Sequence, residues 1–172
     1  MKKLLAGFLA AVCLSPIYSV HAQQGDAKAG SQKNAQCVGC HGIKGYHTGF
    51  PEVYRVPMLS GQSAGYIVAA LNDYKSGARK HPSMSTMALS LTAQDMADLG
   101  AFYESTALAA ETPAHPIDAG AGAALVEKGG CIACHGQGLS KPIAPTYPKI
   151  AGQHADYVYA ALRAYKTENK PQ

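Results

Sequence analysis

The chain has 172 residues, of which 47% are apolar and 15% are charged, and its formal net charge is +4. This balance is typical of a compact chain, and it excludes a disordered tail, a collagen-like repeat and a coiled coil. Without the two lysines at positions 2 and 3, 13 Lys and Arg remain against 11 Asp and Glu, a net charge of +2. The small charge argues against a nucleic-acid-binding protein, which concentrates positive charge on one face.

Residues 1–22 have the pattern of a secretory signal peptide. Two lysines precede an apolar run over residues 4–12, and Val20 and Ala22 occupy the minus-three and minus-one positions of a cleavage site. The run is too short to span a bilayer, and no later segment is long enough. A lipid anchor at Cys13 is disfavoured, because the preceding Val12 is larger than a lipoprotein cleavage site accepts. We therefore expect cleavage after Ala22 and a soluble, exported protein.

A helix predicted over residues 27–36 ends at the first of two copies of a cysteine motif. The motifs are Cys37-Val38-Gly39-Cys40-His41 and Cys131-Ile132-Ala133-Cys134-His135. Two thiols three residues apart can add to the two vinyl groups of one haem, and the adjacent histidine then faces the iron. The motifs predict two covalently bound haem c groups, with His41 and His135 as axial iron ligands.

Three other readings of the cysteines compete with haem attachment. Each pair could form a disulfide or act as a redox pair, but neither role requires a histidine after the second cysteine. Two cysteines and one histidine from each motif could also bind zinc, although a structural zinc site needs four ligands and no fourth is evident. Haem attachment explains all three residues of both motifs.

The rest of the first half predicts helices separated by irregular loops. After a glycine-rich loop, a helix is expected over residues 63–75 with Ser63 as its N-cap. A loop follows over residues 78–90, and Thr92-Ala93-Gln94-Asp95 opens a third helix. Few stretches alternate as strands do, so the predicted fold class is all-α.

The loop over residues 78–90 contains two candidates for the distal ligand of the first iron, Met84 and Met87. A thioether favours reduced iron and raises its potential. A methionine that only fills the core is the alternative reading. His47 and His81 could also reach an iron, and two histidine ligands would lower its potential.

Pro57 and Pro148 occupy matching positions after the two motifs. A ligating imidazole usually donates its second nitrogen to a carbonyl oxygen, which fixes the ring. We expect these proline carbonyls to accept from His41 and His135. The alternative is that each proline only stiffens the loop before a helix.

An internal repeat divides the chain. The segment 59–66 recurs at 150–157, an offset of 91, and the two cysteine motifs begin 94 positions apart. A proline-containing stretch between them reads as a stiff linker. The expected organisation is a signal peptide (1–22), a first domain (23–107), a linker (108–117) and a second domain (118–172).

Two further segments resemble a known family when they are taken together with the cysteine motifs. They are Pro57-Met58-Leu59-Ser60-Gly61-Gln62 and its repeat Pro148-Lys149-Ile150-Ala151-Gly152-Gln153. The chain resembles a diheme class I cytochrome c of the cytochrome c4 family over essentially its whole mature sequence. The resemblance implies two tandem cytochrome c-like domains, each a ring of short helices around a haem. It also selects Met84 as the distal ligand by its interval from the last helix, with Met87 as the alternative.

The second domain departs from the family's pattern. The chain stops at Gln172, so counterparts of Met84 and of the last helix are missing. We expect this domain to be incomplete at its C-terminus, through truncation or because the chain is a fragment; an open distal site is the remaining explanation. His154 is the only downstream histidine, and we do not expect it to bind iron.

The resemblance implies a periplasmic one-electron carrier, not an enzyme, between respiratory donors and a terminal oxidase. Its partners would be redox proteins, with no nucleic acid and no stable membrane insertion. Two alternatives remain: the cytochrome subunit of a periplasmic dehydrogenase, acting for example on sulfide or an alcohol, and a catalytic second haem. The basic run Lys75, Arg79, Lys80 and His81 is interpreted as a solvated loop, with haem propionates or an acidic partner as its alternative contacts.

Overall fold

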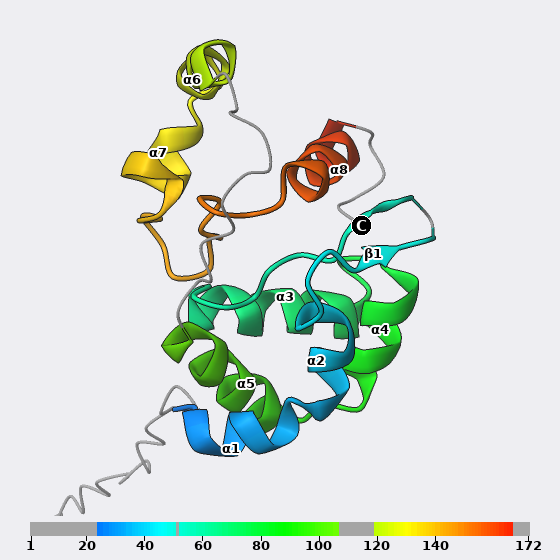
Figure 1. Ribbon diagram of the computed structural model, residues 1–172. Helices are drawn as coiled ribbons and strands as arrows, with labels where there is room; N and C mark the ends of the chain where they lie inside the picture. The colour runs from blue at the N-terminus through cyan, green and yellow to red at the C-terminus, as the bar shows by residue number, and fades with distance from the viewer. Residues whose placement is uncertain (1–23, 51, 107–118, 167–172) are drawn as a thin grey trace, which may run out of the picture.

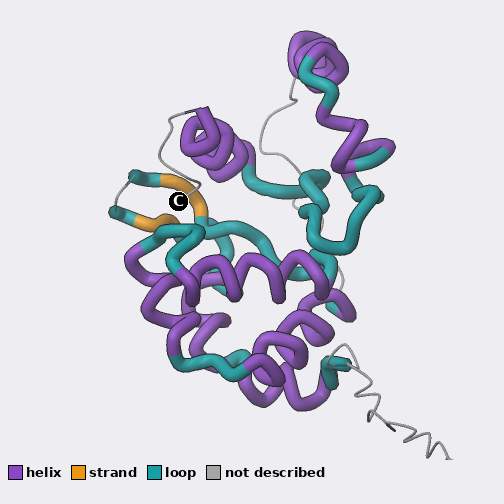
Figure 2. The backbone as a smooth tube through the Cα atoms, turned by 180° about the vertical axis from the view of Figure 1, so that it is seen from behind, coloured by secondary structure: helices purple, strands orange, loops and turns teal. Residues whose placement is uncertain are grey.

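A computed structural model describes residues 24–50, 52–106 and 119–166 (Figure 1). The predicted signal peptide and the predicted linker lie outside these described residues. Residues 24–50 and 52–106 form one helical body, and residues 119–166 form a second, smaller group of helices above it in Figure 1; Figure 2 shows the same separation from behind. Within the described residues only one short antiparallel pair of strands occurs, β1 (His47–Thr48) and β2 (Tyr54–Arg55). The predicted all-α class is confirmed.

Five helices form the first body: α1 (Ala27–Lys33), α2 (Ala35–His41), α3 (Ala64–Ser76), α4 (Pro82–Leu89) and α5 (Ala93–Ser105). α3 follows Ser63 and ends at Gly77, whose φ of 79° lies in the left-handed region that glycine adopts without strain. α5 opens with a capping box, in which Thr92 Oγ1 accepts from the Asp95 backbone and Asp95 Oδ2 accepts from the Thr92 backbone. The predicted starts of these two helices are confirmed to within one residue.

The apolar core of the first body is built around α5. This helix packs against α1 and α3, and α3 packs against α4. The buried cluster consists of Ile67, Leu71, Leu91, Met96, Leu99 and Tyr103. Met96 and Leu99 are each only 1% exposed. Burying such side chains contributes about 1.5–3 kcal/mol apiece, so this cluster is a main source of the body's stability.

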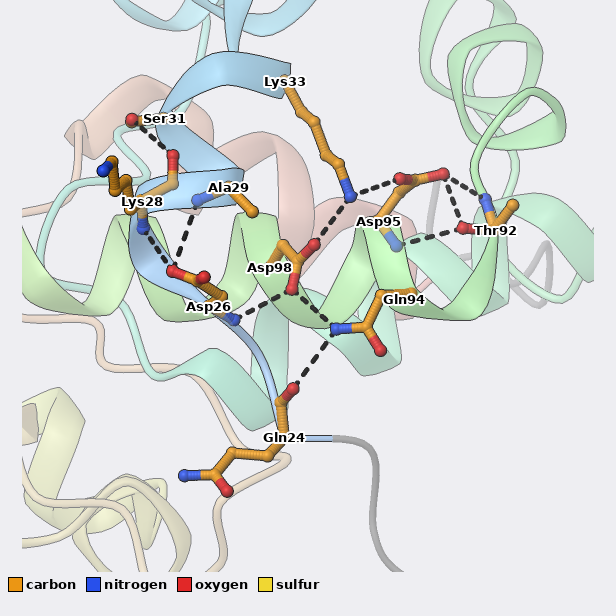
Figure 3. Close-up of polar contacts among 10 residues, drawn as sticks. All are labelled: Gln24, Asp26, Lys28, Ala29, Ser31, Lys33, Thr92, Gln94, Asp95 and Asp98. Carbon is orange, nitrogen blue, oxygen red and sulfur yellow. Dashed lines mark hydrogen bonds and ion pairs between the residues drawn. The ribbon is translucent and has the colours of Figure 1, made fainter.

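A polar network joins α1 to the start of α5 (Figure 3). Asp98 has a side chain only 3% exposed, and it forms an ion pair with Lys33 Nζ at 2.6 Å. Its Oδ1 accepts from the Asp26 backbone at 2.8 Å and from the Gln94 amide at 2.7 Å. Lys33 also pairs with Asp95 at 2.7 Å. Because every oxygen of Asp98 has a partner, its burial is compensated.

This network predicts a stability that falls in acid. The hydrogen bond from the Asp26 backbone, aided by Lys33 and Gln94, holds the pKa of Asp98 below its usual range. A lowered pKa stabilises the folded state above the unfolded value, about 3.9, and this contribution is lost as the pH falls further. We expect Asp98→Asn to lower the thermal unfolding temperature at pH 7, and the gap from the wild type to narrow below about pH 4.

Circular dichroism melts from pH 3 to pH 7 would measure that gap. Asp73→Asn is the control, because Asp73 is an exposed residue of α3, and it is expected to melt with the wild type throughout. A gap between Asp98→Asn and the wild type that stays constant with pH would contradict the assignment.

Two predicted boundaries were wrong. The single helix expected over 27–36 is two helices that meet at Asn34, so Cys37 lies inside α2 instead of after a helix. The loop expected over 78–90 contains α4, which carries both Met84 and Met87. Pro82 stands in the first turn of α4, where its missing N–H costs nothing, and the His81 side chain caps the helix. Short polar and methionine-rich segments like this one give little periodic signal.

The second body contains α6 (Ala119–Lys128), α7 (Cys131–His135), a short 3₁₀ helix η1 (Gln137–Leu139) and α8 (Ala155–Lys166). Among residues 119–166, only Gly136 and His154 are buried. Tyr159, Leu162 and Tyr165 of α8 are 64%, 61% and 70% exposed. The described apolar core therefore lies almost entirely in the first body. None of the helices in the described ranges combines the length and apolarity that crossing a bilayer requires.

Candidate functional site

The first cysteine motif lies on α2, next to the core of the first body. Cys37 packs against the buried cluster, whereas Cys40 is exposed. The Tyr103 hydroxyl of α5 donates to Asn34 Oδ1 at the start of α2 and thus ties the two helices together. His41 Nδ1 donates to the Pro57 carbonyl oxygen at 2.7 Å. This bond leaves Nε2 as the nitrogen available to a metal.

The second motif repeats this arrangement on α7. Cys131 is half-buried and Cys134 is exposed. His135 Nδ1 donates to the Pro148 carbonyl oxygen at 2.8 Å, which matches the bond in the first body. The expectation that both proline carbonyls accept from the motif histidines is confirmed. Since a carbonyl acceptor fixes both the tautomer and the ring orientation, each histidine keeps Nε2 available to a metal.

The cysteine chemistry favours haem over the alternatives. All four described cysteines are free thiols, so neither motif closes a disulfide. The described residues contain no group of three or more His, Cys, Asp or Glu side chains arranged to hold a metal ion, so a zinc site lacks a ligand set. Paired thiols beside a histidine with one free nitrogen are the donors that covalent haem attachment requires.

A cavity of about 910 Å³ runs past both motifs. Its wall includes Cys37, Cys40 and His41 of the first motif and Cys134 and His135 of the second. Apolar side chains of α3 and α5 also line it, among them Leu71 and Leu99. A large, mostly apolar space that meets both sets of donors fits a bulky macrocycle held by thioether links. The residues present therefore fit haem c.

Both methionine candidates for the distal position reach this cavity from α4. Met84 is half-buried and packs against the core cluster, whereas Met87 is 42% exposed. His81 Nδ1 accepts from the Met84 backbone at 3.4 Å, so one nitrogen of that ring already caps the helix. His47 also lines the cavity, and its Nε2 lies 4.0 Å from Asp156 Oδ2. Of the two methionines, Met84 is therefore the one whose thioether is better shielded from solvent.

Burial also sets the protonation of the first motif. It lowers the pKa of His41, with the Pro57 carbonyl opposing this shift. It raises the pKa of the Cys37 thiol, which a hydrogen bond with Tyr103 partly offsets. At neutral pH the imidazole is neutral, which is the form that binds iron, and the buried thiol is protonated.

Two reciprocal glutamine contacts join the bodies. Gln62 Nε2 donates to the Lys149 carbonyl at 3.0 Å, and its Oε1 accepts from the Lys149 backbone at 2.9 Å. Gln153 makes the same pair of bonds with the Met58 backbone, at 3.0 and 2.9 Å. The glutamines are 91 positions apart, as are Met58 and Lys149, so the contacts follow the internal repeat. The repeated Gly-Gln dipeptide was visible in the sequence, but its role in docking the two halves was missed.

Charged contacts extend this interface beside the β-strands. Arg55 of β2 donates to Asp156 at the start of α8, with Nε 3.1 Å from both carboxylate oxygens. Arg163 of α8 lies 3.3 Å from Glu52. The rings of Tyr54 and Tyr157 meet with centroids 5.9 Å apart. Sequence reasoning found none of these pairs, because they join residues about 100 positions apart.

The solvated-loop interpretation of the basic run is wrong for Arg79. Arg79 lines the cavity and bonds to the hydroxyls of Tyr66 and Tyr157. Lys75 is an exposed residue at the end of α3, and its Nζ donates to the Leu91 carbonyl. Lys80 is exposed and follows the expectation. His154, the other histidine considered, is buried at the start of α8 and does not line the cavity.

Comparisons with known proteins agree with this geometry. The sequence model of the cytochrome c family matches residues 27–107 and again residues 119–172. Cytochrome c4 of Thiocapsa roseopersicina is 36% identical over 156 residues, which cover 84% of this chain and 77% of that protein.

Two further proteins extend the comparison. The thiosulfate dehydrogenase electron acceptor of Stutzerimonas stutzeri strain A1501 is 31% identical over 83% of this chain and 67% of its own length. The solved structure of Acidithiobacillus ferrooxidans cytochrome c4 superposes with a TM-score of 0.67 at 25% identity, covering 80% of this chain and 84% of that one. Two cytochrome c domains with covalently bound haem c follow from these matches: the chain belongs to the cytochrome c4 family of diheme electron carriers.

Proposed function

We propose that each cysteine motif holds one haem c through two thioether bonds. Cys37 and Cys40 attach the first haem, and Cys131 and Cys134 attach the second. His41 and His135 would each bind the iron of the haem on their own motif, and Met84 would supply a second ligand to the first iron. The observation that carries this assignment is that both histidines line one cavity while their Nδ1 atoms are already bonded to Pro57 and Pro148.

The protein's own residues would then set the reduction potential of the iron and keep water away from it. Haem iron supplies one-electron chemistry when bound. The carbonyl bonds hold the two imidazoles in a fixed orientation, and apolar residues such as Leu71 and Leu99 keep water from the cavity wall. A neutral thioether from Met84 stabilises the reduced state more than a second imidazole would. These features suit a carrier that accepts and returns an electron with little rearrangement.

We infer that the chain is a periplasmic one-electron carrier and catalyses no reaction on a substrate. The proposed direction of flow is from respiratory donors to a terminal oxidase. The shared cavity and the reciprocal glutamine contacts support exchange between the two haems within one molecule. Purified, reduced protein should be oxidised rapidly by the oxidase in stopped-flow mixing, and lack of oxidation would contradict this destination.

A second candidate is supported by one relative in particular. The Stutzerimonas stutzeri protein is named as an electron acceptor of thiosulfate dehydrogenase. Here the chain would receive electrons directly from a periplasmic dehydrogenase and serve as its cytochrome partner. Mixing the oxidised protein with that dehydrogenase and thiosulfate would separate the candidates, because rapid reduction together with stable copurification favours the dehydrogenase partner.

Haem attachment is the most direct prediction. A pyridine haemochrome assay with intact mass should count two covalent haems on the exported protein. The paired variants Cys37→Ala with Cys40→Ala, and Cys131→Ala with Cys134→Ala, should each lose one haem and keep the other, because thioether formation is local to each motif. A colourless wild-type protein with free or bridged thiols would overturn the proposed function.

A further inference from the structure

Arg79 lies where the two bodies meet and is held by tyrosines from both. Its Nη1 donates to the Tyr66 hydroxyl of α3 at 3.1 Å, and its Nη2 donates to the Tyr157 hydroxyl of α8 at 2.8 Å. The guanidinium carbon lies 4.8 Å from the centre of the Tyr74 ring. Tyr66 and Tyr157 are repeat counterparts, 91 positions apart. A single arginine thus bridges equivalent positions of the two halves.

The bonding of this arginine is incomplete. Arg79 Nε is buried and has no hydrogen-bond partner. Among the described residues, no Asp or Glu forms an ion pair with Arg79. A guanidinium has five N–H donors and is always charged, so this partly buried group keeps an unpaired donor at Nε and a charge that no carboxylate compensates.

The neighbouring hydroxyls do not supply the missing charge. Burial raises the pKa of Tyr74 to about 12, although the Arg79 cation opposes this shift. Burial likewise raises the pKa of Tyr157, again against Arg79. Both phenols are therefore neutral at physiological pH and offer Arg79 only dipoles. The cluster needs an anion from elsewhere.

The residues of this cluster line the same cavity as the cysteine motifs. Arg79, Tyr66, Tyr74 and Tyr157 all line it, together with His41 of the first motif and His135 of the second. Arg79, Tyr66 and Tyr74 belong to the first body, which carries the first motif. Haem c carries two propionate carboxylates, and a carboxylate is the planar partner that a guanidinium binds best. We propose that Arg79 binds a propionate of the first haem and, through Tyr66 and Tyr157, couples that haem to the docking of α8. This inference rests on the proposed haem sites.

Two consequences follow from this role. A cation beside the macrocycle favours reduced over oxidised iron, so Arg79 raises the potential of the first haem. The same cation holds the Tyr157 hydroxyl of the second body, so its loss weakens the contact between α8 and the first body. Arg79 is therefore a positioning residue that acts on the iron through the propionate.

The test compares three variants of the full-length, haem-loaded protein. Arg79→Gln removes the charge, and Arg79→Lys keeps the charge but loses the planar fork. Lys80→Gln is the matched control, because Lys80 is the next residue, has the same charge, is exposed and does not line the cavity. Potentiometric titration measures the midpoint potential of each haem, and resonance Raman spectra report hydrogen bonding to the propionates.

Arg79→Gln is expected to lower the potential of the first haem, Arg79→Lys to lower it less, and Lys80→Gln to leave it unchanged. The propionate bending band should move in both Arg79 variants, so Arg79→Lys carries the test alone if Arg79→Gln yields no holoprotein. The inference would be overturned if both Arg79 variants kept the wild-type potential of the first haem and the wild-type position of the propionate bending band. The haem count of the wild type tests the proposed function separately, since it does not depend on Arg79.

Discussion

Met84→Ala is expected to lower the midpoint potential of the first haem and to open its distal side. The thioether stabilises reduced iron, and axial ligands set haem potentials over about 0.8 V, so a fall on the order of 0.1 V or more is expected. The variant should also bind carbon monoxide at the first haem, since the position opposite His41 is free. Potentiometric titration and carbon monoxide difference spectra measure both effects.

Met87→Ala is the matched control for this experiment. Met87 lies on the same helix, one turn after Met84, and also reaches the cavity, but it is 42% exposed. It should keep the wild-type potential and fail to bind carbon monoxide. If Met87→Ala shows the lowered potential and Met84→Ala does not, the ligand assignment must be exchanged between the two residues.

Gly30→Ala is expected to cause a large loss of stability in the first body. A Cβ at Gly30 would lie 2.1 Å from the Asp98 carbonyl oxygen and 2.7 Å from Phe102 Cβ. The first contact is with the backbone of α5, which cannot rotate away, so α1 and α5 must separate. Overpacking of this kind costs about 1–3 kcal/mol, occasionally more. The separation would also strain the Asp98 network that joins the same two helices.

Gly122→Ala tests whether the effect comes from packing. Gly122 is a helical glycine in α6, and a Cβ there would meet nothing within 4 Å. Alanine in an exposed helix is favoured by about 0.5–1 kcal/mol, so this variant should be neutral or slightly stabilised. Thermal melts followed at the haem Soret band and in the far ultraviolet would compare the unfolding temperatures of Gly30→Ala, Gly122→Ala and the wild type. Equal stability of Gly30→Ala and the wild type would show that α1 does not pack as closely as described.

The features that sequence alone predicted well depend on residues that lie close together in the chain. The cysteine spacing in each motif indicated covalent haem, and the repeat indicated two domains. Pro57 and Pro148 were correctly predicted as acceptors for the two histidines. The capping pattern of Thr92 and Asp95 correctly predicted the start of α5. Each of these signals acts between residues close in the chain, so each survives without knowledge of the fold.

The features that sequence reasoning missed depend on distant residues. α4 was expected as a loop, because its eight residues have little periodicity and its stability comes from packing against α3. Arg79 was interpreted as solvated, since a basic residue in a loop is usually exposed. Nothing near it in the chain reveals that Tyr157, 78 positions later, places a hydroxyl beside its guanidinium.

The amino-acid order thus determined the chemistry of the chain: which thiols can hold a haem, which rings can bind its iron, and that the unit occurs twice. Only the folded arrangement decided how the two units meet, through Gln62 with the Lys149 backbone, Gln153 with the Met58 backbone, and Arg79 between two tyrosines. Thioether chemistry needs only a fixed spacing along one helical turn. Docking of the two bodies needs complementary surfaces formed by residues about 90 positions apart in the chain. Those surfaces exist only once both bodies have packed.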